Sequence, residues 1–230
     1  MQTSVEQAGP KQLELQTPPI AVFKLIVVGD SGIGKSTFIK RFSTEIIEEL
    51  VINDQNITVY KTRFATSIGV IQFNVWDLNG ASVDIDSPEE FFIGADCAIL
   101  MFDTMNRTSY KNLLFWFKKI QSFHESQRIP TVLVANKVDC EGRKVKAKYI
   151  IFHRRKNIAY SEVSAEANYN VEEPFLYLAR ALTKDKELSL VELSVLQPPS
   201  IMMDQRQIEN IEIQRREADQ TPFMEEDDDD

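Results

Sequence analysis

The chain has 230 residues, which suits one domain of ordinary size with an appendage, and 43% of them are hydrophobic. Its formal net charge of -9 argues against direct nucleic-acid binding, and six of the acidic residues form the terminal run 225–230. Because the sequence has two isolated cysteines, no long apolar run and no lipidation motif, we expect a reducing compartment, no signal peptide and no membrane anchor.

The first 20 residues are polar and contain three prolines, so we expect a flexible lead-in. Residues 22–28 form an apolar run typical of a strand in a buried parallel sheet, and a helix is expected over 35–42. Between them, residues 29–36 read GDSGIGKS, which fits the P-loop pattern in its required strand–helix context. A chance glycine-rich turn is the competing interpretation, and the adjoining strand, helix and Lys-Ser pair argue against it.

The chemistry expected of this loop is phosphate binding. Its glycines let backbone N–H groups face phosphate oxygens, the Lys35 ammonium would lie at the β and γ phosphates, and the Ser36 hydroxyl could be a ligand of Mg²⁺. The residues predicted to bind the phosphates are Asp30, Ser31, Gly32, Ile33, Gly34, Lys35, Ser36 and Thr37.

The following elements alternate between strands and helices. Residues 45–56 are expected to be irregular, and residues 77–96 to form a loop with a short helix. Alternating runs over 58–65 and 70–76 predict a hairpin. Further strands are expected over 97–103, 131–136 and 158–162, and further helices over 107–122 and 171–182. Cys97 opens one of these apolar runs and is expected to be a core thiol. The pattern predicts an α/β fold in which a mostly parallel six-stranded sheet is covered by helices on both faces.

The pair Pro198-Pro199 marks a boundary beyond this alternation. The expected organisation is a lead-in, a nucleotide-binding domain, a linker, a further helix and an acidic tail, over residues 1–20, 21–184, 185–203, 204–218 and 219–230. No internal repeat is recognisable.

Residues 136–139 read NKVD directly after an expected strand, and they resemble the guanine-specificity motif of small GTPases. The Asp139 carboxylate could accept hydrogen bonds from N1–H and the exocyclic amine of guanine, a pair that adenine does not offer. The resemblance implies that Asn136 contacts the other side of the base and that the Lys137 stem lies over the ring. The last base-contacting loop would be Ser164, Ala165 and Glu166.

Alone, the NKVD run could be a solvated loop. Its spacing from the P-loop, about a hundred residues, favours guanine binding. The motif and the lack of an arginine-rich lid both disfavour a P-loop kinase that uses ATP.

The resemblance narrows to the Ran family of nuclear transport GTPases and covers about residues 22–230. It is carried by residues 73–77, 110–112, 143–148, 152–157, 168–170, 174–176 and 178–180, by the Pro-Pro linker and by the acidic terminus. The resemblance implies GTP or GDP with Mg²⁺ as cofactors, and a monomer found in nucleus and cytoplasm. The implied partners are karyopherin transport receptors, Ran-binding proteins and an exchange factor.

Residues 77–80 read DLNG and stand where this family has Asp-x-x-Gly. The resemblance implies that Asp77 holds Mg²⁺ through water and that the Gly80 N–H senses the γ phosphate. A strand-end turn is the competing interpretation of Asp77, and the position between hairpin and helix favours the functional one.

Three positions depart from the family. Ala81 stands where a glutamine orients the attacking water, and Glu166 replaces a lysine. In an alignment with a one-residue insertion, Asn53 stands where a threonine closes over Mg²⁺ and the γ phosphate. Residues 82–90 also differ and gain acids. We therefore assign no catalytic residue. The expected protein is a Ran-type switch with weak intrinsic hydrolysis, or a GTP-binding module that engages Ran-type partners without cycling.

The segment 143–156 carries seven basic residues and no acidic one. A solvated face is one interpretation of this pattern. The other is a transient docking surface for the acidic run 225–230, because a tethered segment has a millimolar effective concentration and each exposed ion pair contributes about 0–1 kcal/mol. The Ran resemblance implies that the tail lies near the core in the GDP state and is released in the GTP state.

Overall fold

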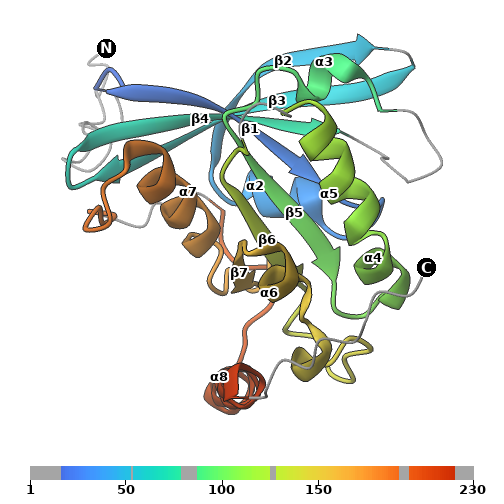
Figure 1. Ribbon diagram of the computed structural model, residues 1–230. Helices are drawn as coiled ribbons and strands as arrows, with labels where there is room; N and C mark the ends of the chain where they lie inside the picture. The colour runs from blue at the N-terminus through green and yellow to red at the C-terminus, as the bar shows by residue number, and fades with distance from the viewer. Residues whose placement is uncertain (1–16, 53, 79–86, 125–127, 192–196, 221–230) are drawn as a thin grey trace, which may run out of the picture.

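The computed structural model describes residues 17–52, 54–78, 87–124, 128–191 and 197–220. In these ranges a sheet of seven strands is ordered β2-β3-β4-β1-β5-β6-β7 (Figure 1). The strands are β1 (Ala21–Val28), β2 (Ser43–Ile52), β3 (Gln55–Thr66), β4 (Gly69–Leu78), β5 (Cys97–Asp103), β6 (Thr131–Asn136) and β7 (Ala159–Glu162). Only the β2–β3 and β3–β4 pairs are antiparallel, so the sheet is mixed and mostly parallel.

Helices cover both faces of this sheet, as Figure 1 shows for α5 and α7. They are α2 (Lys35–Lys40), α3 (Glu89–Phe92), α4 (Arg107–Lys111), α5 (Leu113–Ser122), the 3-10 helix η1 (Ala147–Tyr149), α6 (Phe152–Lys156), α7 (Glu173–Thr183) and α8 (Gln205–Gln220). None of them is long and apolar enough to cross a membrane.

The sheet separates the hydrophobic core into two clusters, and successive residues of β1 belong to one cluster and the other in turn. Leu25 and Val27 belong to the cluster under α2 and α7, whereas Ile26 and Val28 belong to the cluster under α3 and α5. Successive side chains of a strand point to opposite faces, so an apolar run can fill both clusters at once. Cys97 is fully buried in the first cluster, which confirms the expected core thiol.

The expectation of an irregular segment over 45–56 is wrong. Most of it forms β2, which pairs with β3 in a register that sets Glu49 opposite Thr58 and Val51 opposite Asn56. The β-branched residues of β2 suit an extended chain, but the ladder with β3 is what holds the strand. Asp54 has φ of 60°, a conformation that aspartate tolerates at a tight turn. The predicted six-stranded sheet is therefore extended to seven strands.

The helix expected over 107–122 is two helices that meet at Asn112. Asn106 caps α4, because its side chain accepts a hydrogen bond from the Thr108 N–H at 3.0 Å. The Asn112 side chain instead donates a hydrogen bond from Nδ2 to Asp30 Oδ2 of the P-loop, at 2.7 Å. The hairpin and the strands over 97–103 and 131–136 are confirmed as predicted.

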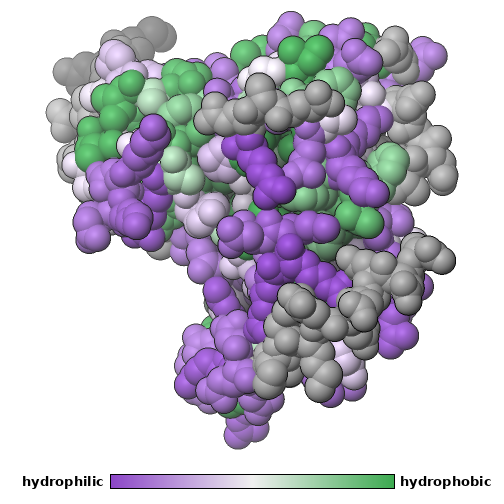
Figure 2. All heavy atoms as spheres, in the orientation of Figure 1, coloured by the Kyte–Doolittle hydropathy of each residue, from purple (hydrophilic) through white to green (hydrophobic). Residues whose placement is uncertain are grey.

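The helix expected over 204–218 is α8, and it lies apart from the sheet in Figure 1. Its one buried residue is Ile211, on the side that contacts η1. The surface of α8 visible in Figure 2 is predominantly hydrophilic, as expected of a helix with a modest apolar face. The acidic run 225–230 lies outside the described residues.

Candidate nucleotide-binding site

The P-loop joins the carboxyl end of β1 to α2 and needs glycine where its backbone is most crowded. Gly34 has φ of 97°, and a Cβ there would lie 2.4 Å from the side-chain nitrogen of Asn136. Lys35 is buried and turns back over the loop, where its Nζ donates to the carbonyls of Gly29 at 2.8 Å and Asp30 at 2.9 Å. The loop thus holds a cation at its centre.

Burial lowers the pKa of Lys35, and the nearby carboxylates Asp77 and Asp30 act in the opposite direction. A buried ammonium whose hydrogen-bond partners among the described residues are carbonyls favours an added negative charge, because that charge offsets its desolvation. Phosphate oxygens would supply that charge.

The Asp30 side chain points away from this centre, although the sequence places it among the phosphate-binding residues. Its Oδ1 accepts from Trp116 Nε1 at 2.8 Å, and its Oδ2 accepts from Asn112 Nδ2 at 2.7 Å. Asp30 therefore anchors the loop to the start of α5 and has only its backbone to offer a phosphate. Sequence reasoning missed Asn112 and Trp116, and neither belongs to a motif that could have indicated this role.

Ser36 and Asp77, the two residues predicted to hold Mg²⁺, lie next to each other. Because β4 runs parallel to β1 with Asp77 opposite Val27, the Asp77 carboxylate reaches the P-loop, and its Oδ2 accepts from Ser36 Oγ at 2.5 Å. Its Oδ1 is buried and has no hydrogen-bond partner among the described residues, and burial raises the pKa of Asp77. An orphaned carboxylate oxygen beside a hydroxyl fits a hydrated hard cation.

The predicted contributions of Asn53, Gly80 and Ala81 fall outside the described residues.

The NKVD motif lies at the end of β6 and connects the two sides of the site. Asn136 is almost fully buried; its Nδ2 donates to the Ile33 carbonyl at 2.8 Å and its Oδ1 accepts from the Ala165 N–H at 3.1 Å. The Asn136 side chain thus sets the distance between the P-loop and the loop predicted to contact the base.

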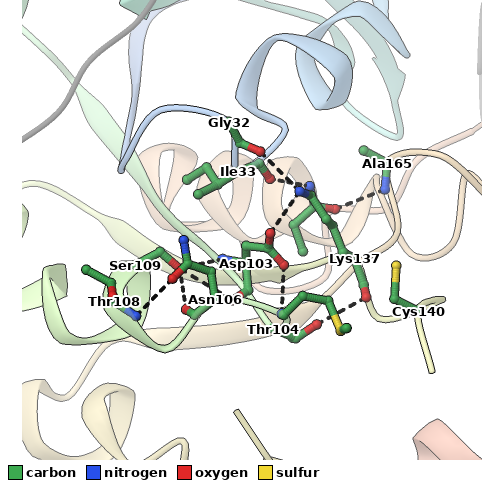
Figure 3. Close-up of polar contacts among 12 residues, drawn as sticks. Gly32, Ile33, Asp103, Thr104, Asn106, Thr108, Ser109, Lys137, Cys140 and Ala165 are labelled. Carbon is green, nitrogen blue, oxygen red and sulfur yellow. Dashed lines mark hydrogen bonds and ion pairs between the residues drawn. The ribbon is translucent and has the colours of Figure 1, made fainter. Parts of the chain in front are cut away.

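Lys137 extends from the same strand end toward the P-loop (Figure 3). Its Nζ lies 2.8 Å from Asp103 Oδ2 and donates to the Gly32 carbonyl at 3.1 Å. Its φ is 64°, an uncommon conformation for lysine that the surrounding bonds hold, among them Thr104 Oγ1 to the Lys137 carbonyl at 3.1 Å. The aliphatic stem is therefore held in a fixed place.

Asp139 carries the second orphaned carboxylate oxygen of the site. Within the part of the chain that the structure describes, its Oδ1 is buried without a hydrogen-bond partner, and its Oδ2 accepts a weak bond from Cys140 Sγ at 3.4 Å. Buried acceptors are normally satisfied, so this oxygen is ready for an external donor. Asp139 also lines a hollow of about 770 Å³, whose opposite wall is formed by Gln207, Asn210 and Gln214 of α8.

The loop of Ser164, Ala165 and Glu166 is brought to this site only in part. Ser164 and Ala165 are buried beside Asn136, and the Ala165 N–H is used by that side chain. The Glu166 carboxylate faces Arg41, with 3.4 Å between Oε2 and Nη2. Arg41 was missed by sequence reasoning, because nothing in the pattern around it distinguishes it from a basic residue at the end of a helix.

A protein-family comparison agrees with this arrangement. A family model described as the Ras family matches residues 24–184, about seven tenths of the chain. The match runs from β1 to the end of α7 and includes each described residue predicted to bind nucleotide or metal.

Proposed function

Since this chain belongs to the Ras family of small GTPases, we propose that it is a GTP-binding switch of the Ran type that acts in nuclear protein import and export. The coarser part of this statement follows from the family, whose members bind GTP or GDP and Mg²⁺. The Ran type, the transport role, the nuclear and cytoplasmic location and the partners are the proposal.

The observation that carries guanine recognition is that two carboxylate oxygens of the site, Oδ1 of Asp77 and Oδ1 of Asp139, have no hydrogen-bond partner among the described residues. They lie at the two ends of one site, joined by Lys35, Asn136 and Lys137. A guanine nucleotide offers what both lack, because its base presents two N–H donors and its phosphates recruit a divalent cation.

The residues of the chain bind and orient the nucleotide. The Lys35 ammonium is the cation at the P-loop centre, and Asn136 fixes the distance between the phosphate loop and the base loop. Ser36 and Asp77 would hold Mg²⁺, which when bound neutralises charge on the β and γ phosphates. Asp139 would select guanine over adenine.

The Ran type is supported by the chain beyond residue 184. Residues 198–201 and α8 return to the domain, where Ser200 N donates to the Glu166 carbonyl at 2.8 Å and Arg154 Nη2 donates to the Ala218 carbonyl at 2.6 Å. A C-terminal helix that contacts the basic segment 143–156 is what the tail-docking hypothesis requires. That the acidic run 225–230 joins this contact remains a prediction.

The second candidate function is a GTP-binding module that does not cycle. It is favoured by Ala81, because a methyl group cannot orient water by hydrogen bonding, as the family glutamine does. Both candidates share one site, and they differ in the rate of hydrolysis.

Three measurements test the proposal and separate its two candidates. Nucleotide extracted from the purified chain should be GDP or GTP, and adenine nucleotide alone would overturn guanine binding. The chain loaded with a non-hydrolysable GTP analogue should bind a karyopherin transport receptor much more tightly than the GDP-loaded chain. Equal affinities, or binding in neither state, would overturn the Ran type. Single-turnover hydrolysis of bound GTP then separates a slow switch from a module without turnover.

A further inference from the structure

Arg41 is a buried cation at the end of α2, and the partners of its side chain come from two other parts of the chain, the loop 165–166 and the segment 198–200. Its residue exposure is 4%, so its N–H groups are satisfied by protein and not by bulk water. Nε donates to the Ala165 carbonyl at 2.5 Å, Nη1 donates to the Pro198 carbonyl at 2.7 Å, and Nη2 donates to Ser200 Oγ at 2.9 Å. The Glu166 carboxylate lies 3.4 Å from the same Nη2.

These bonds join the phosphate side of the site to its base side. Arg41 follows the helix that begins with Lys35 and Ser36, whereas Ala165 is the residue whose N–H meets Asn136. The Ala165 peptide groups are thus fixed from two directions, by Asn136 through its N–H and by Arg41 through its carbonyl. A guanidinium that donates several hydrogen bonds from its planar group both stabilises its partners and fixes their relative orientation. The ammonium of a lysine lacks this planar set of donors and cannot reproduce that orientation.

The C-terminal segment 197–201 completes this arrangement. The Ser200 and Ile201 N–H groups both donate to the Glu166 carbonyl, at 2.8 and 3.4 Å, and Asn168 Nδ2 donates to the Gln197 carbonyl at 2.9 Å. Without this segment the guanidinium loses two acceptors, the Pro198 carbonyl and the Ser200 hydroxyl, and only the loop 165–166 still holds it.

The same segment walls a hollow of about 360 Å³ next to the nucleotide site. That hollow is lined by Thr37 and Lys40 of α2, by Arg41 and Glu166, and by Gln197, Pro198 and Ser200. The predicted phosphate-binding Thr37 and the C-terminal segment therefore face one space.

We propose that Arg41 is a positioning residue for the guanine-contacting loop, and that the docked segment 197–201 slows nucleotide release by completing its bonds. The inference deepens the proposed function and rests on guanine-nucleotide binding. Coupling between two sites is reciprocal, so bound GDP favours the docked segment, and displacement of the segment speeds GDP release. Glu166, which departs from the family lysine, supplies the charge opposite Arg41.

The test is the release rate of fluorescent N-methylanthraniloyl GDP from the full chain, chased with excess GDP in Mg²⁺. Arg41→Lys should speed release at least about tenfold, which is about 1.4 kcal/mol. Ser200→Ala should speed release severalfold, and Ser200→Thr, which keeps the hydroxyl, should restore the original rate. Arg180→Lys is the matched control, because Arg180 Nε donates to the Leu188 carbonyl at 2.8 Å, away from the base loop, and its release rate should be unchanged.

The double variant Arg41→Lys with Ser200→Ala distinguishes coupling from two independent effects. Its release rate should be lower than the product of the single effects predicts, because both changes break one hydrogen-bonded unit. Unchanged release in both single variants would overturn the inference, and so would lowered melting temperatures without faster release. If the unaltered chain holds no guanine nucleotide, guanine binding itself is wrong; if it holds the nucleotide and Arg41→Lys does not speed release, this inference alone fails.

Discussion

Replacement of Asp139 by asparagine is the sharpest test of base recognition. The change keeps the size of the side chain and leaves the weak contact with Cys140 possible, but it removes the negative charge and puts an N–H₂ group beside the base. The N–H donors of guanine would then face the N–H₂ donor of the new asparagine. Xanthine carries a carbonyl in place of the exocyclic amine, so it can accept a hydrogen bond from the new amide.

The expected loss of GTP affinity follows from the burial and hydrogen bonding of the Asp139 carboxylate. Oδ1 of Asp139 is buried with no partner in the described chain, so the two donors of guanine would meet an acceptor that is already desolvated. A hydrogen bond to a charged group contributes about 1.5–3 kcal/mol, so two such bonds contribute about 3–6 kcal/mol. At 1.4 kcal/mol per decade, GTP affinity should fall by about 100-fold or more.

Competition against a fluorescent guanine nucleotide measures this effect with GTP, XTP and ATP as competitors. Asp139→Asn should bind XTP better than GTP, whereas the unaltered chain should prefer GTP. Glu141→Gln makes the same chemical change two residues away at an exposed position and should keep the preference for GTP. If Asp139→Asn retains a strong preference for GTP, or if the unaltered chain binds ATP as well as GTP, the assignment is wrong.

Three further predictions concern catalysis, the tail and pH. Ala81→Gln should raise single-turnover GTP hydrolysis about tenfold or more, because an amide can orient the attacking water; an unchanged rate would mean that turnover is limited elsewhere. Deletion of residues 225–230 should favour GTP over GDP in equilibrium binding at low salt, and the shift should shrink as salt rises; equal GTP/GDP affinity ratios with and without the run would contradict tail docking. Burial lowers the pKa of His153 to about 4 from 6.5, so the unfolded state binds more protons between these values and stability should rise with pH across that window. In urea unfolding, His153→Phe, which can still stack on Tyr160, should flatten this rise and the His124→Gln control should keep it; equal pH slopes in all three proteins would contradict the assignment.

The sequence was sufficient where chemistry depends on contiguous residues. The P-loop requires glycines, a lysine and a hydroxyl in one turn, and the NKVD run places its amide, amine and carboxylate at the end of one strand. Apolar runs likewise predicted β1, β5 and β6, because a strand buried on both faces needs apolar residues at most of its positions.

The strand β2 could not be predicted in this way. Its segment mixes Glu45, Glu48 and Glu49 with exposed Ile46 and Val51, so neither face carries a clear alternation. Its strand conformation comes from the ladder to β3, and a ladder is decided by which segments the fold places side by side.

The sequence by itself thus predicted which residues would meet the nucleotide, and the tertiary structure decided what holds those residues in place. Asp30 reaches Trp116 across 86 positions of the chain, and Arg41 reaches Pro198 across 157. A side-chain hydrogen bond extends only about 3 Å, so its partner is fixed by how strands, helices and loops pack. Local sequence indicates where glycine is needed in the backbone and where apolar residues recur. The hydrogen bonds that set the distance between the P-loop and the base loop form only once the sheet has brought their residues together.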